Sequence, residues 1–352
     1  MKKGKVFVGL SGGVDSSVSA ALLKNAGYDV TGVFIKVWQP NFLPCSQEID
    51  RLDALRVAAH LRIPFFTLDL EREYKKEVLD LMISGYGRGE TPNPDVLCNR
   101  AIKFGGFYKF ACSLRADFIA TGHYAKVGIF GDKPSLLEGA DNEKDQSYFL
   151  WMLNEEDLKH SLFPVGDMNK NEVRAFAKKF GLPTADRKDS QGLCFMGELD
   201  MKEFLSHFLP KKSGRVQNEK GDVIGTHEGA HFYTIGERHG FETLKKTNKE
   251  EPLYVISKNI KENIITASPR KLLEKGKTRF RLENINFING EPDFLKKYTA
   301  RIRYRQNLFE VSIKKVEGKI IIETASPQYV DVGQSAVIYD NERVVGGGIV
   351  SA

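Results

Sequence analysis

The sequence has few cysteines and no long apolar run. Four cysteines in 352 residues are too sparse for a disulfide scaffold, and no two are spaced as a Cys-x-x-Cys pair, which disfavours a structural zinc site. No window resembles the apolar span of about 18 residues that a transmembrane helix needs, so we expect no membrane association. The first strand is predicted so close to Met1 that no signal or transit peptide fits before it, and a cytoplasmic location is expected.

The sequence also has only a small surplus of basic over acidic residues, and this surplus lies in the C-terminal part of the chain. The formal net charge is +6. Residues 211–352 hold 25 Lys+Arg against 18 Asp+Glu, whereas residues 1–210 hold 27 against 28. The surplus is densest over residues 270–305, with 11 basic residues and 4 acidic ones. Such a surplus indicates either a polyanion-binding face, with nucleic acid as the first candidate, or a solvated lysine-rich surface.

Strand and helix patterns alternate over the first 200 or so residues. Helical patterns lie between apolar runs that are typical of buried strands, which occupy residues 6–10, 31–38, 64–68 and 118–122. The helical patterns occupy residues 14–25, 48–61, 71–84, 99–114 and 170–180. This rhythm predicts an α/β fold with a doubly wound parallel sheet.

From about Gly214 onward, the sequence pattern changes to short alternating apolar runs, and no long amphipathic helix is predicted. This pattern indicates β structure. We expect a catalytic α/β domain over residues 1–209 and a small central β-rich domain over residues 210–269. A β-barrel-like domain is expected over residues 270–352.

A glycine-rich turn joins the first predicted strand to the first predicted helix. Residues 11–17 read SGGVDSS. Its glycines permit backbone N–H groups to approach an anion at the positive end of the helix, and its serines add hydroxyl donors. No Gly-Lys-Ser/Thr follows, so a Walker A loop is disfavoured. The turn is similar to the PP-loop of ATP pyrophosphatases and predicts a nucleotide site; the alternative is an ordinary strand-to-helix turn.

Two further loops carry a cysteine. Residues 91–104 read TPNPDVLCNRAIKF, and Asn99 could open the following helix. We therefore expect Cys98 at a helix N-terminus, where the thiolate is favoured. Residues 189–195 read DSQGLCF and place Cys194 shortly after a glycine. Taken singly, each cysteine is more typical of a small buried residue, and Cys45 and Cys112 are interpreted in that way, with Cys112 in a core-facing helix.

In combination and in this order, the SGGVDSS, PNPDVLCN and DSQGLCF motifs resemble the tRNA-specific 2-thiouridylases, the MnmA-type enzymes of the PP-loop ATP pyrophosphatase superfamily. The resemblance runs along nearly the full length and includes GVFIKVW, ATGHYAKV and VGQSAVIYD. It implies an ATP-dependent sulfurtransferase that adenylates the C2 oxygen of the wobble uridine in a tRNA anticodon. Sulfur from a cysteine persulfide then replaces that oxygen. Another PP-loop enzyme, either a different tRNA modifier or a small-molecule synthetase, is the alternative.

The resemblance also implies cofactors and partners. ATP and Mg²⁺ are expected, with no metal cluster built by the protein and with Asp15 as the candidate Mg²⁺ contact. The expected partners are tRNA, and not DNA, together with a cysteine desulfurase or a sulfur-relay protein.

Site residues follow from the same resemblance. Cys194 matches the persulfide-bearing cysteine, Cys98 the nucleophile that forms a transient disulfide with it, and Asp95 a candidate general base. The ATP site matches Gly9, Leu10, Ser11, Gly12, Gly13, Val14, Asp15, Ser16, Ile35 and Gly122, with Ile35 in place of the methionine that the family leads us to expect. Contacts to tRNA match Asn93, Pro94, Asp95, His123, Lys144, Asp145, Gln146, Arg303, Tyr304 and Gln334.

Plainer interpretations of these residues remain open. His123 could bond its own loop, and residues 144–146 could form an exposed turn. Strand alternation would place Arg301, Arg303 and Arg305 on one face, which favours phosphate binding but also fits a solvated strand.

Overall fold

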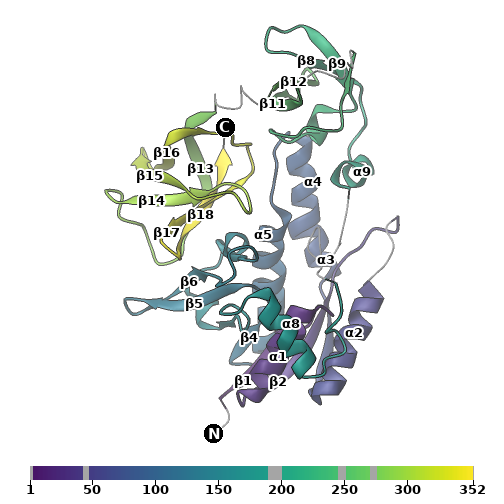
Figure 1. Cartoon of the computed structure of the whole chain (residues 1–352), viewed down its shortest axis with the longest axis vertical. Helices are drawn as coiled ribbons and strands as arrows, with labels where there is room; N and C mark the ends of the chain where they lie inside the picture. Colours follow the sequence, from purple (N-terminus) through teal and green to yellow (C-terminus); the bar gives the residue numbers. More distant parts are fainter. Residues whose placement is uncertain (1–2, 43–46, 189–199, 245–250, 270–275, 352) are drawn as a thin grey trace.

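The computed structural model describes residues 3–42, 47–188, 200–244, 251–269 and 276–351. Its strands form three sheets (Figure 1): a parallel sheet near the N-terminus, a small sheet in the middle of the sequence, and a C-terminal barrel. The fold class expected from the sequence is therefore confirmed.

The first sheet is parallel throughout, with the strand order β3-β2-β1-β4-β7. Its strands are β1 (Lys5–Gly9), β2 (Asp29–Lys36), β3 (Phe65–Asp69), β4 (Phe118–Ala120) and β7 (Ser161–Leu162). Successive side chains of a strand point to opposite faces. Phe7 accordingly packs in one core cluster, whereas Val6 and Val8 pack in another. Helices thus cover both faces of the sheet.

Three helices pack on the face that contains Val6 and Val8: α1 (Val14–Asn25), α2 (Gln47–Leu61) and α8 (Lys170–Lys179). The opposite face is covered by segments with π-helical turns between them. The first segment is α3 (Glu71–Tyr74), η1 (Lys75–Leu79) and α4 (Asp80–Gly87). The second is α5 (Pro94–Cys98), η2 (Asn99–Gly106) and α6 (Phe107–Ser113).

The second of these segments begins earlier than the sequence suggested. Asn93 accepts hydrogen bonds from the backbone N–H groups of Asp95 (3.2 Å) and Val96 (3.3 Å), and Pro94 occupies the first turn. An asparagine cap followed by proline is a favoured helix start. The prediction that Asn99 opens the helix is therefore wrong.

The small sheet has the order β10-β9-β8-β12-β11 and follows α9 (Met201–Ser206). Its strands are β8 (Gly214–Gln217), β9 (Val223–His227), β10 (Glu242–Thr243), β11 (Leu253–Asn259) and β12 (Ile264–Pro269), with the short helix η4 (Ala230–Phe232) between β9 and β10. Met82 and Tyr86 of α4 share its core, and Figure 1 shows α4 reaching toward this sheet.

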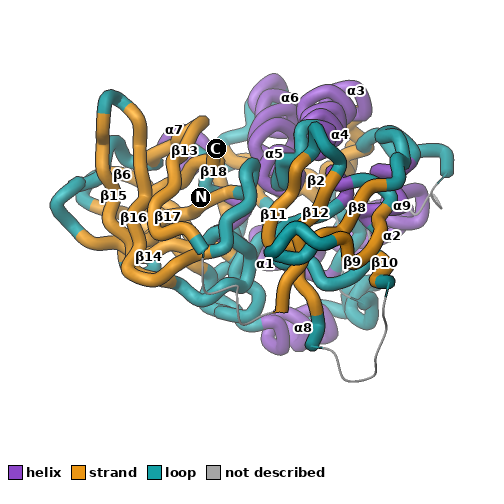
Figure 2. The backbone as a smooth tube through the Cα atoms, turned by 90° about the horizontal axis from the view of Figure 1, so that it is seen from above, coloured by secondary structure: helices purple, strands orange, loops and turns teal. Residues whose placement is uncertain are grey.

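The C-terminal barrel closes because β13 (Lys277–Phe287) pairs with both β16 (Lys319–Gln328) and β18 (Arg343–Ser351). The remaining barrel strands are β14 (Lys297–Arg301), β15 (Phe309–Val316) and β17 (Ser335–Asp340). Seen from above (Figure 2), the barrel lies beside the α/β unit and the small sheet.

A hairpin of the α/β unit extends the barrel sheet. It consists of β5 (Ala125–Phe130) and β6 (Lys133–Glu138), and β6 meets β18 where Leu137 pairs with Arg343. The chain then passes through η3 (Ser147–Leu150) and α7 (Glu155–Lys159), and Trp151 is fully buried against Gly347 of β18. These contacts fix the barrel against the unit that contains the SGGVDSS turn.

Candidate functional site

The SGGVDSS turn lies between the carboxyl end of β1 and the start of α1. Gly12 has φ +77°, and a Cβ atom there would lie 2.5 Å from the carbonyl oxygen of Asp50, so only glycine fits. Gly13 is the N-cap of α1 and, as a glycine, has no side chain that could cap the first backbone N–H groups of the helix. The hydroxyls of Ser11 and Ser16 are hydrogen-bonded to each other at 3.2 Å within the turn. Hydroxyls and the first backbone N–H groups of a helix together form an anion-binding cradle.

The predicted ATP-site residues outside the turn lie next to it or beneath it. Gly122 follows β4, and a Cβ atom there would lie 2.7 Å from the backbone nitrogen of Ser16. Leu10 and Ile35 are buried, and the backbone N–H of Leu10 donates to Val33 at 2.8 Å. The structure thus places Gly122 against the turn and Ile35 in the core, and the roles of these residues toward ATP stay predictions.

Asp15, the second residue of α1, is held by two donors. Its Oδ1 accepts a hydrogen bond from the Tyr124 hydroxyl at 2.8 Å and pairs with the Lys170 ammonium at 2.6 Å. Lys170 begins α8, which Asn169 and Glu172 cap reciprocally. Sequence reasoning missed Lys170. The capping pattern signals the start of α8, but it does not show which helix α8 meets.

Arg187 is a second cation that sequence reasoning missed. It donates to the carbonyl oxygen of Gly12 at 3.0 Å and forms ion pairs with Asp50 and Asp53 of α2. These contacts tie the turn to α2 and to the chain just before residue 189. The predicted Cys194 and its loop lie outside the described residues, as does Cys45.

Cys98 is the last residue of α5 and is fully buried in the core cluster that also contains Ile35 and Phe107. Because Asn93 starts the helix, Cys98 lies a full turn inside it, and the expected position at a helix N-terminus is wrong. Cys112 shows the opposite error. It was expected in the core, yet it is exposed on the outer face of α6. Neither observation tests the catalytic roles of Cys98, Asp95 and Cys194, which stay predictions.

His123 is buried and has partners for both ring nitrogens. Nδ1 lies 2.7 Å from the Thr121 hydroxyl, and Nε2 lies 3.2 Å from the Lys103 ammonium. An ammonium only donates, so Nε2 accepts and the proton is on Nδ1. Burial and then the charge of Lys103 lower the pKa of His123 well below its ordinary value. His123 is therefore neutral and bonds its own loop, the plainer of the two interpretations, while its role toward tRNA stays a prediction.

Within the described residues, no group of three or more His, Cys, Asp or Glu side chains is arranged to hold a metal ion. No helix in this part of the chain has both the length and the apolar character to cross a membrane.

Comparison with protein families matches the chain in three successive segments. Residues 4–198 match the family described as tRNA methyl transferase HUP domain. Residues 202–269 match the tRNA methyl transferase PRC-barrel domain, and residues 277–350 the aminomethyltransferase beta-barrel domain. The three segments follow the same order as the α/β unit, the small sheet and the barrel.

Curated relatives align along almost the whole chain. The tRNA-specific 2-thiouridylase MnmA of Listeria monocytogenes is 42% identical over 98% of this chain and 94% of its own length. The protein of the same name from Nitrosomonas eutropha is 42% identical over 100% and 99%. The chain belongs to the tRNA-specific 2-thiouridylase family. A solved structure, the U34-tRNA thiolase NcsA from Methanococcus maripaludis, is remote, with 17% identity and a TM-score of 0.34 over 59% of this chain and 65% of that one.

Two of the tRNA-contact positions expected for a 2-thiouridylase are engaged inside the protein. Asp145 is buried and accepts hydrogen bonds from Gly139 N (3.0 Å) and from the N–H (3.1 Å) and hydroxyl (2.9 Å) of Ser147. Gln146 and Tyr124 exchange two hydrogen bonds of 3.0 and 2.8 Å. The open alternative of an exposed turn is therefore wrong for Asp145. Lys144 is partly exposed beside these two residues.

The expected arginine stripe of the barrel does not exist as a strand face. Strand β14 ends at Arg301, and Arg305 has φ +64° in the turn that follows. Arg301 is buried and pairs with Glu138 of the hairpin. Arg303 donates to the carbonyl oxygen of Ile235 in the small-sheet unit at 2.6 Å. Only Arg305 of the three is exposed, and it lies over the ring of Tyr304.

The predicted contact Gln334 borders a polar junction of three units. Its Oε1 accepts from the N–H of Asp331 at 3.1 Å. The Asp331 Oδ2 in turn accepts from the Thr91 hydroxyl (2.7 Å) in the α/β unit. It also accepts from Ile235 N (3.2 Å) and Lys258 Nζ (2.8 Å) in the small-sheet unit. We call Asp331, Thr91, Ile235 and Lys258 the Asp331 junction.

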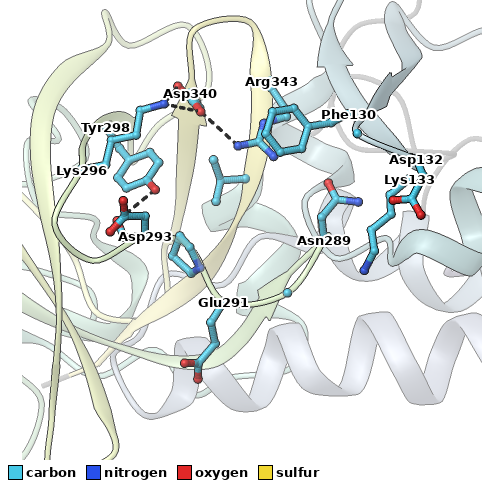
Figure 3. A pocket seen from close by; sticks show the side chains of 14 residues that line it. Phe130, Asp132, Lys133, Asn289, Glu291, Asp293, Lys296, Tyr298, Asp340 and Arg343 are labelled. Atoms are coloured by element: carbon cyan, nitrogen blue, oxygen red, sulfur yellow. Dashed lines mark hydrogen bonds and ion pairs between the residues drawn. The ribbon is translucent and has the colours of Figure 1, made fainter.

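A pocket of about 430 Å³ lies elsewhere, between the β5–β6 hairpin and the barrel (Figure 3). Lys296 and Arg343 both pair with Asp340 there, and the Arg343 guanidinium lies 3.6 Å from the centre of the Phe130 ring. None of the residues that line it is a predicted site residue, so we interpret it as part of the hairpin–barrel contact.

Proposed function

We propose that this protein catalyses the ATP-dependent 2-thiolation of the wobble uridine in tRNA. The observation that carries the proposal is the SGGVDSS turn at the start of α1, in a chain that aligns from end to end with tRNA-specific 2-thiouridylases. ATP supplies an adenylyl group that converts the uridine C2 oxygen into a leaving group. The turn, with its helix N–H groups and serine hydroxyls, holds the phosphates and the departing pyrophosphate.

The sulfur step uses the two predicted cysteines. The C2 oxygen attacks the α-phosphorus of ATP, and pyrophosphate leaves. The Cys98 thiolate attacks the inner sulfur of the Cys194 persulfide, which forms a Cys98–Cys194 disulfide and releases the terminal sulfur as hydrosulfide. That sulfur attacks C2 of the uridine, and AMP leaves with the former C2 oxygen. Asp95 takes the thiol proton, and an external thiol reductant restores both cysteines.

The positions of Asn93 and Pro94 support this arrangement. Asn93 caps α5, so the loop that leads to Asp95 and Cys98 has one defined path into the helix. Pro94 is buried, which fixes that path further. Because Cys98 is buried in this structure, its reaction with the persulfide requires part of the cover over the thiol to move. The uridine must leave its stack to meet the sulfur that this reaction releases.

We further propose Mg²⁺ as the partner of ATP, with Asp15 near the ion, and a cytoplasmic setting with a desulfurase or relay protein as sulfur donor. For tRNA, the support is the basic surplus of the C-terminal third and the position of Arg305 and Tyr304. The Tyr304 ring lies 4.5 Å from that of Phe149, and both side chains are partly exposed, so we propose these rings as the stacking site for an unpaired base.

The test is nucleoside analysis of tRNA after reaction with ATP, Mg²⁺ and a persulfide donor. We expect 2-thiouridine from the parent, and none from Cys98→Ser or Cys194→Ser while ATP still binds. Cys112→Ser, on an exposed face, is the matched control and stays active. Appearance of 4-thiouridine in place of 2-thiouridine, or full activity of either serine variant, would contradict the proposal.

A further inference from the structure

The ammonium of Lys170 lies at the first turn of α1, beside the cradle formed by the SGGVDSS turn. It contacts Asp15 Oδ1 at 2.6 Å, and its side chain is 13% exposed. Lys170 comes from a helix that follows the turn by more than 150 residues. No prediction from the sequence assigned it a role.

The charge of Asp15 makes a neighbouring cation necessary for an anion site. A carboxylate in the first turn is stabilised by the helix dipole, but it repels any phosphate that approaches the same N–H groups. The Lys170 ammonium forms an ion pair with the Asp15 carboxylate and so offsets its negative charge. The cradle can then offer its N–H groups and hydroxyls to a polyphosphate without net repulsion from its own acid.

The position of Lys170 is fixed by the fold and not by the ion pair alone. Its backbone N–H donates to Asp141 Oδ2 at 2.9 Å, immediately after the Asn169 cap. Val173 and Ala177 of the same helix pack in the core cluster that contains Val18 of α1. The ammonium therefore stays near the start of α1 when Asp15 changes partner.

We propose that Lys170 binds the polyphosphate of ATP and stays bound to the pyrophosphate until it leaves the site. An ammonium can donate three hydrogen bonds, and phosphate oxygens compete for them with Asp15 Oδ1. In the absence of nucleotide the Asp15 pair holds the ammonium in place. With ATP present, Lys170 bridges Asp15 and the phosphates. The inference rests on the proposed use of ATP but not on the sulfur chemistry.

The experiment measures ligand binding to the full-length protein by calorimetry, with ATP, inorganic pyrophosphate and adenosine as separate probes. Lys170→Met should bind ATP and pyrophosphate roughly 10- to 100-fold more weakly, because a charge-assisted hydrogen bond is lost. Its affinity for adenosine should match the parent. Lys170→Arg, which keeps the cation, should bind ATP within a few-fold of the parent.

Lys178→Met, an exposed lysine in the last turn of the same helix, is the matched control and should leave all three affinities unchanged. If Lys170→Met lowers the melting temperature but binds ATP like the parent, the ion pair only fastens α8 to α1 and the proposal is wrong. If Lys170→Met does not fold, Lys170→Gln decides: a thermal shift with pyrophosphate that is smaller than the parent's supports the proposal, and a shift equal to the parent's overturns it. If the parent forms no 2-thiouridine but its ATP binding still depends on Lys170, the proposed function is wrong and this inference stands.

Discussion

The SGGVDSS turn and the Asp331 junction are both polar clusters around one carboxylate, yet the chain builds them in opposite ways. In the turn, glycines and hydroxyls that are adjacent in sequence lie at the N-terminus of α1. Two cations from distant parts of the chain, Lys170 and Arg187, contact this turn. At the junction, every member comes from a different stretch of the chain, and Lys258 and Asp331 are 5% and 3% exposed. The first cluster is arranged to receive a ligand, whereas the second is closed and joins three units.

The difference has an energetic consequence. A buried ion pair contributes little net stability, because desolvation offsets its attraction, but removal of one partner leaves an uncompensated charge. The junction also fixes the chain just before Asn93 and Asp95, since Thr91 N donates to Val332 O at 2.7 Å. We infer that the junction specifies how the barrel is docked, while the turn specifies what is bound.

The largest expected effect is from Asp331→Ala. It leaves the Lys258 ammonium buried without its carboxylate, and we expect a loss of about 3–5 kcal/mol in the free energy of unfolding. Chemical denaturation followed by fluorescence measures it. Glu310→Ala breaks the exposed pair with Lys297 on the barrel and is the control, with a change within about 0.5 kcal/mol. Equal effects in the two variants would erase the distinction between a closed junction and an ordinary surface pair.

A smaller effect on stability, but a larger one on binding, is expected from Gly12→Ala. An alanine at φ +77° is strained by about 1–3 kcal/mol, and its Cβ would also press on the Asp50 carbonyl. Gly27→Ala is the matched control, because Gly27 has φ +90° at the far end of α1 with open space around its Cβ position. Both variants should lose stability in denaturation. Only Gly12→Ala should lose ATP affinity in calorimetry, and retention of that affinity would show that the turn tolerates a shifted backbone.

These two clusters also show what the sequence could predict. The turn was predictable because a strand, two glycines and a helix start are contiguous, and the parallel sheet followed from the alternation of apolar runs. The junction was not, because Thr91, Lys258 and Asp331 carry no local signal that they meet. The arginine stripe failed for a related reason: alternation assumes that the strand continues, and β14 ends at Arg301. The position predicted for Cys98 was wrong because Asn93 caps the helix, whereas the sequence offered Asn99 as its first residue.

The smallest effect that we predict concerns protonation of His123, which lies after β4 and contacts Lys103 of η2. Its folded-state pKa is depressed, by burial first and then by Lys103. Below the unfolded-state value of about 6.5, the unfolded chain binds a proton that the folded protein refuses, so stability is lost as the pH falls. Above about pH 7 both states are neutral and the contribution is constant.

His123→Gln removes this titration while it retains a side chain that can bond Thr121. The parent should lose stability between about pH 6.5 and 5 more steeply than the variant, in melting curves recorded at half-unit steps. His227 and His231 also have lowered pKa values from burial, so the difference between the two curves is the informative quantity, because it cancels their contribution. Parallel curves would mean that His123 becomes protonated in the folded protein, which requires the Lys103 ammonium to move away from Nε2.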